Sequence, residues 1–166
     1  MSLIAAAPPL VRTTPPSDPA PLGVVSAGDW WPEIDLAAMR DTMRLDGAVT
    51  AARLRAAVQD AMATTIDQLA AWALVHMTAG IASLADVPTA LQIDGESSAV
   101  QRFRRAVYCT AKANLIERYS DYDTTGRARK DTQEETRDGQ AEEHRRDATW
   151  AIRDILGVPR LTVDLI

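Results

Sequence analysis

The longest regular pattern of hydrophobic and polar positions in the chain is a helical one. Apolar side chains recur at steps of three and four residues, which places them on one face of a helix. Thr50 is a suitable N-cap and Gly80 a suitable stop, so the pattern predicts a helix from Thr50 to about Thr78. Its inner face is expected to carry Leu54, Val58, Met62, Ile66, Leu69 and Trp72.

Three further segments show helical spacing. A short helix is predicted from Asp35 or Leu36 to about Leu45, with Asp35 as N-cap and Asp46-Gly47 as its end. Longer helices are predicted from near Glu96, after the turn Asp94-Gly95, to Tyr119, and from Thr132 to Gly157. Their inner positions are Leu36, Met39 and Met43, then Val100, Phe103, Val107, Ala111, Asn114 and Leu115, then Ala148, Ala151, Ile152 and Ile155.

The first half of the last helix is charged on nearly every side. Acidic and basic residues alternate between Asp131 and Asp147, and Glu142 precedes Arg146 by four residues, the favourable order for an ion pair on a helix. A helix with this pattern faces solvent or makes polar contacts with neighbouring subunits.

Both ends of the chain depart from helical spacing. Prolines between residues 5 and 28 favour an extended backbone, so residues 1–31 are expected to form a Pro-rich arm. This arm is either a disordered tail or a segment ordered on a neighbouring subunit. Trp30 and Trp31 end it, and they serve either as an anchor on a partner or as core side chains of the same subunit.

The C-terminal residues alternate apolar and polar side chains, as a strand does. A single strand is not stable alone, so the segment is expected to extend a sheet or occupy a groove on another subunit. The alternative is a frayed tail packed on its own bundle. The candidate interface residues at the two ends are therefore Trp30, Trp31, Arg160, Leu161, Val163, Leu165 and Ile166.

Together these elements predict an all-α fold. The 166 residues suit one domain, and a hydrophobic content of 46% with few aromatic residues favours helices packed through small and aliphatic side chains. We expect a bundle of about four helices at residues 32–157, preceded by the arm at 1–31 and followed by an extended or β-like tail at 158–166.

Charge and composition argue against several classes of protein. The net charge of -5 argues against general affinity for a nucleic-acid backbone, although a helical DNA-binding accessory, such as a packaging or regulatory subunit, remains an alternative. Cys109 is the only cysteine, so no intrachain disulfide forms. No apolar run is long enough to span a membrane, and an export signal is not expected.

No motif predicts catalysis, a cofactor or a metal. Residues 121–126, DYDTTG, resemble the start of a calcium loop, but Thr132 stands where the bidentate glutamate would be, so an ordinary turn is expected. His76 and His144 lie in different predicted helices without nearby cysteine or paired carboxylates. Gly95-Glu96-Ser97 lacks the second glycine of a nucleophile elbow.

Arg102, Arg104 and Arg105 surround Phe103 and could suggest contact with nucleic acid. The helical stripe places Phe103 in the core and distributes the arginines over the other faces. Ion pairs or a solvated surface are therefore expected.

Several segments resemble one family, the head-completion proteins (protein L type) of peduovirus-like contractile-tailed phages, which are similar in architecture to helical head-tail connectors. The resemblance runs from about Trp31 to Ile166, and the Pro-rich arm departs from it most. The segments that carry it are MRLDGAVTAARLRAAVQDAMA (43–63), LADVP (84–88), IDGES (93–97), LIERY (115–119) and WAIRDILGVPRLTVDLI (150–166).

The resemblance implies a structural role without catalytic residues. Such a protein is expected to form a homo-oligomeric ring, matching the portal's dodecamer, on the portal protein after DNA packaging. It would retain the genome, let packaged DNA pass through its channel without sequence-specific binding, and offer a surface to a tail-completion or tail-terminator protein. The implied location is the virion, at the portal vertex, and the host cytoplasm before assembly.

Overall fold

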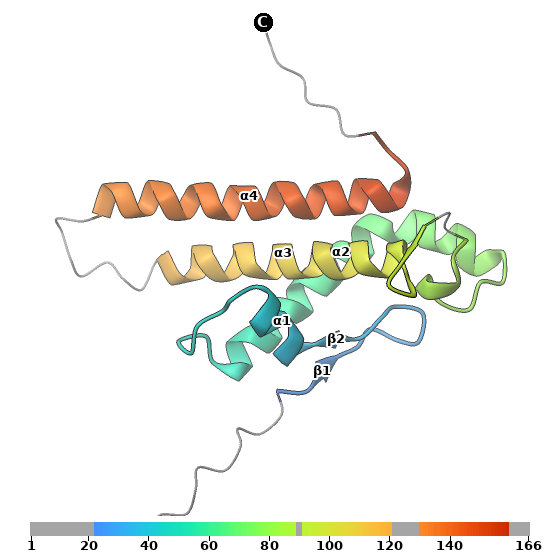
Figure 1. Ribbon diagram of the computed structural model, residues 1–166, viewed down its shortest axis with the longest axis horizontal. Coiled ribbons are helices and arrows are strands. Elements are labelled where there is room, and N and C mark those ends of the chain that lie inside the picture. Colours follow the sequence, from blue (N-terminus) through green and yellow to red (C-terminus); the bar gives the residue numbers. More distant parts are fainter. Residues whose placement is uncertain (1–21, 89–90, 121–129, 160–166) are drawn as a thin grey trace, which may run out of the picture.

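The computed structural model describes residues 22–88, 91–120 and 130–159 of the chain. Within these residues four α-helices dominate, which confirms the predicted all-α bundle (Figure 1). Two small hairpins and one turn of 3₁₀ helix complete the order, which is β1 (Val24–Val25), β2 (Ile34–Asp35), α1 (Leu36–Thr42), α2 (Ala51–Thr78), η1 (Leu84–Asp86), β3 (Gln92–Ile93), β4 (Glu96–Ser97), α3 (Ser98–Ser120) and α4 (Lys130–Leu156).

Helix α3 is the central element of the bundle. It lies antiparallel to α4, while α2 crosses behind it (Figure 1). The predicted inner stripe of α3 is buried, except that Asn114 is half-buried and donates a hydrogen bond from Nδ2 to Asp60 Oδ2 of α2 at 2.9 Å. The buried members of the stripe are Val100, Phe103, Val107, Ala111 and Leu115.

The inner faces predicted for α2 and α4 also pack against this centre. In α2, Ile66 and Trp72 are partly buried and the remaining predicted positions are fully buried. In α4, all four predicted positions are buried, from Ala148 to Ile155. The apolar second half of α4 therefore closes the core, as its spacing indicated.

The short helix α1 ends earlier than predicted, at Thr42 instead of about Leu45. Arg44 adopts a positive φ of 51°, and the amide of Leu45 donates to the carbonyl of Arg40 at 3.0 Å. These features define a Schellman end, in which a left-handed residue satisfies the last carbonyls of the helix. The prediction was wrong here because this position usually holds glycine, and an arginine gives no such signal.

Two short segments form strands that the sequence did not predict: residues 24–25, which were assigned to the arm, and residues 96–97, which were assigned to the start of a helix. Val24 and Val25 pair antiparallel with Asp35 and Ile34, so residues 22–31 contact the bundle, whereas residues 1–21 lie outside the described part. Helix α3 begins at Ser98 because Glu96 and Ser97 pair with Ile93 and Gln92 across the Asp94-Gly95 turn. Both turn residues have positive φ, 55° and 75°, as this tight hairpin turn requires.

Candidate functional site

Trp30 and Trp31 join the β1–β2 loop to the rest of the molecule. Trp31 is only 8% exposed and stacks on Phe103, with 5.1 Å between ring centroids. Trp30 is half-buried, and its Nε1 donates to the carbonyl of Ile81 at 3.1 Å. In the single chain Trp31 is therefore a core side chain, one of the two alternatives given above. A role of either tryptophan in a contact between subunits stays a prediction.

The other candidate interface residues, Arg160, Leu161, Val163, Leu165 and Ile166, lie outside the described residues. The calcium-like segment 121–126 lies outside them as well.

The arginines around Phe103 are engaged within the chain. Arg104 forms two hydrogen bonds to the carboxylate of Glu96, at 2.8 and 2.9 Å, and Arg105 forms an ion pair with Asp147 at 3.0 Å. Arg102 donates to the backbone carbonyl of Asp154 at 3.0 Å. These contacts confirm the expected ion pairing and connect α3 to β4 and α4. They leave fewer unpaired cations for a phosphate backbone.

The titratable groups of the body respond to packing. Glu96 accepts hydrogen bonds from Arg104, and these bonds lower the pKa of the Glu96 carboxyl group. The same bonds raise the pKa of the Arg104 guanidinium. Burial raises the pKa of the Cys109 thiol and of the Tyr108 hydroxyl. Burial, followed by the nearby Lys112, lowers the pKa of His144. Among the described residues, no group of His, Cys, Asp and Glu is arranged to hold a metal ion.

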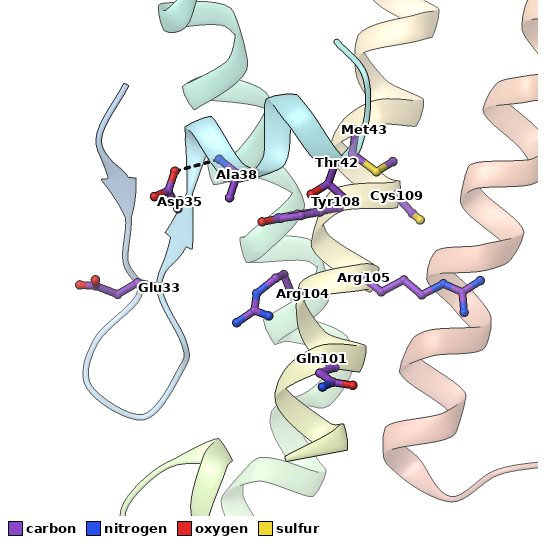
Figure 2. A pocket seen from close by; sticks show the side chains of 10 residues that line it. All are labelled: Glu33, Asp35, Ala38, Thr42, Met43, Gln101, Arg104, Arg105, Tyr108 and Cys109. Carbon is purple, nitrogen blue, oxygen red and sulfur yellow. Dashed lines mark hydrogen bonds between the residues drawn. The ribbon is translucent and has the colours of Figure 1, made fainter. Parts of the chain in front are cut away.

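An apolar groove lies between α1 and α3 (Figure 2). It has a volume of about 540 Å³, and its floor includes the buried side chains of Tyr108 and Cys109. Arg105 reaches away from it toward α4, where Asp147 binds it. We call it the α1–α3 groove; its lining residues are Glu33, Asp35, Ala38, Thr42, Met43, Gln101, Arg104, Arg105, Tyr108 and Cys109.

A second apolar surface lies at the C-terminal end of α2, and the sequence reasoning missed it. Leu74, Val75 and Met77 are 63%, 67% and 40% exposed. The available signal was the absence of any Asp, Glu, Lys or Arg from residue 68 to residue 85. We call this surface the outer face of α2; it consists of the exposed residues Ala70, Ala71, Leu74, Val75, Met77 and Thr78.

Comparison with known proteins assigns the chain to a family. Residues 25–166 match the family model described as Phage head completion protein (GPL). The chain belongs to this family. It is also 39% identical over 151 residues to the "Head completion/stabilization protein" of Escherichia phage P2, a match that covers 89% of this chain and 88% of that protein. No solved structure matches the chain.

This family is the one that the sequence segments resembled, and the match begins at Val25, the second residue of β1. None of the described helices is long and apolar enough to cross a membrane. The surfaces described in this family member are the α1–α3 groove, the outer face of α2 and the exposed charged residues of α4.

Proposed function

We propose that this chain is a structural protein that completes the phage head. In this proposal it assembles as a ring on the portal protein after DNA packaging, retains the genome and offers the surface to which the tail attaches. The observation that carries the proposal is the family match over residues 25–166, together with the 39% identity to the phage P2 protein.

The architecture suits a ring subunit. A ring is built from head-to-tail contacts, so each subunit needs two different complementary surfaces. The outer face of α2 is uncharged, whereas the described part of α4 exposes Glu142, Glu143, Arg145 and Arg146. A helical body with such unlike surfaces supports assembly with several partners, namely further copies, the portal and a tail-completion or tail-terminator protein.

The contacts of the arginines favour this structural role over a DNA-binding accessory. Arg104 and Arg105 neutralise Glu96 and Asp147, and the chain as a whole carries a net charge of -5. Such a surface would let DNA pass through a channel without binding its phosphates tightly.

The decisive experiment is attachment to the portal. Purified protein would be mixed with DNA-filled heads that lack their head-completion protein, and the portal vertex would be imaged by electron microscopy. We expect a ring of added density at the portal, together with retention of DNA that otherwise leaks. Bare portal vertices and continued leakage at saturating protein would refute the proposal. Empty capsids without a portal are the matched control.

A further inference from the structure

The last turns of α2 are apolar on two opposite sides. Leu69 and Ala73 point into the core, and Leu74 and Val75 of the outer face of α2 lie on the other side of the helix, while Met77 lies at the edge between the two sides. The exposed positions 70, 71, 74, 75 and 78 follow the helical repeat and so share one face. The outer face is therefore continuous along two turns.

A helix that is apolar all round is normally buried all round. Exposed apolar residues that gather in one patch mark a contact with another molecule, whereas single ones are ordinary. On α2 two exposed large residues are adjacent, and a third follows within the same turn. Apart from the half-buried His76, whose ring contacts Trp72, no titratable side chain lies among them, so this surface offers few polar groups to water.

The α1–α3 groove lies elsewhere on the molecule and also presents mainly apolar surface, with the carboxylates of Glu33 and Asp35 among its lining side chains. Its lining comes from β2, α1, α3 and the residues beside them, and includes no residue of α2 (Figure 2). Arg104 and Arg105 are neutralised by Glu96 and Asp147. An uncharged helix face can therefore enter the groove without leaving these cations unpaired.

We propose that the outer face of α2 in one copy packs into the α1–α3 groove of the next copy. This inference rests on the proposed ring and assigns its subunit contact. No residue of α2 lines the groove, so the two surfaces are formed by different residues of the chain. A contact between two different surfaces repeats from copy to copy and can close into a ring.

The pairing can be tested by cross-linking single-cysteine variants. Cys109→Ala removes the native thiol, Val75→Cys then marks the outer face of α2, and Thr42→Cys marks the groove, where Thr42 is exposed. Each variant would be assembled on portal-bearing heads, alone and as a mixture, and treated with a short bis-maleimide.

We expect cross-linked dimers at least tenfold more abundant in the mixture than in either variant alone. A chain carrying both new cysteines should give a ladder of dimers, trimers and larger species. Dimers formed by Val75→Cys alone would show a symmetric contact and overturn the inference. Rings that form normally without cross-links in the mixture would also overturn it, while leaving the proposed function intact. Absence of rings with the unmodified protein would refute both.

A charge variant gives an independent measurement. Val75→Glu should abolish ring density at the portal while leaving the circular dichroism of the free subunit unchanged. Gln59→Glu, an exposed position in the N-terminal half of the same helix, is the matched control and should assemble normally. Normal rings with Val75→Glu would contradict the assignment.

The competing occupant of the outer face of α2 is the C-terminal segment of the same chain. To test this, the alkylation rate of Val75→Cys would be measured in the free subunit with and without residues 160–166. We expect the same fast rate in both. A rate that rises at least tenfold on truncation would assign the surface to the chain's own tail and overturn the inference.

Discussion

At the scale of single residues, Trp31 joins the N-terminal hairpin to the central helix. Its ring stacks on Phe103 of α3 with an interplanar angle of 24°, and Trp30 meets it edge-on with 4.6 Å between ring centroids. Trp30 in turn contacts Trp72 of α2. Paired aromatic rings add specific attraction to their buried area. The hairpin position thus depends strongly on one buried ring.

Trp31→Ala should therefore destabilise the subunit itself. Loss of a buried aromatic side chain and the resulting cavity typically cost about 3–5 kcal/mol. Urea unfolding followed by circular dichroism measures this loss. Leu74→Ala is the control, because Leu74 is 63% exposed and its truncation should change the free energy of unfolding by less than about 0.5 kcal/mol. Equal stability of Trp31→Ala and the unmodified chain would contradict the packing described.

Glu96 should titrate below its ordinary pKa of 4.5 because its carboxylate accepts hydrogen bonds from Arg104. The folded-state pKa is lowered, so the pair stabilises the fold above pH 4.5, and this stabilisation is lost as the pH falls through the lowered value. An NMR titration of the Glu96 carboxyl carbon measures it. In Arg104→Gln the pKa should move back toward 4.5. An unchanged midpoint in that variant would show that Arg104 is not the cause.

At the scale of the elements, the two ends of α1 are fixed by local hydrogen bonds. Asp35 Oδ1 accepts from the amides of Ala37 and Ala38 at 2.7 and 3.0 Å. The Schellman end at Arg44 closes the other side. A helix of seven residues has few internal bonds of its own, so these caps contribute much of its stability.

Asp35→Ala should lower the free energy of unfolding by about 0.5–2 kcal/mol, the usual cost of losing an N-cap. Asp35→Asn keeps an acceptor oxygen at the same place and should lose only a small part of this. Chemical denaturation of the three proteins side by side gives the comparison. Similar losses for Asn and Ala would mean that the negative charge, and not the cap, is important.

Helical spacing predicted most of the fold, because each long helix buries one face and leaves a stripe in the sequence. Short paired segments leave no such trace. Val24 and Val25 follow a proline-rich stretch, and only their pairing with Ile34 and Asp35 makes them a strand. Similarly, Asp94-Gly95 indicated a turn, but its flanking strands are too short for an alternating pattern.

The candidate surfaces were harder to predict than the fold. Periodicity identifies the buried face of α2, but it does not reveal that Leu74 and Val75 lie on the opposite, exposed face until the packing partners are known. The groove beside Tyr108 is likewise formed by segments far apart in the sequence. The interface role of Trp30, and that of residues 160–166, stays a prediction.

At the scale of the whole molecule, one buried cluster holds the N-terminal hairpin and the helices together. It includes Val25 of β1, Phe103 of α3 and Ile155 of α4. Ion pairs between Arg105 and Asp147, and between Arg145 and Glu117, join the middle of α4 to α3. Among the described residues, side chains from β1 to the end of α4 thus share one core.

Truncation of residues 160–166 should accordingly leave the subunit folded and weaken its attachment to the portal, if the apolar residues of that segment bind a partner. Circular dichroism and thermal unfolding report on the fold, and cosedimentation with portal-bearing heads reports on attachment. Replacing Leu161, Val163 and Leu165 with serine keeps the length and is the companion variant. Unchanged cosedimentation of both variants would exclude the segment as an interface.

In the described residues, three helices end at a left-handed residue, namely Arg44, Gly80 and Gly157, and these ends determine which substitutions the chain tolerates. Gly80 and Gly157 have φ of 84° and 69°, and a Cβ at either position would meet no atom within 4 Å, so a side chain there is disfavoured by backbone geometry and not by crowding. In a saturation library selected for folding, these sites should retain glycine and then asparagine. Position 44, which now holds arginine, should be enriched in glycine, while valine and isoleucine are depleted at all three.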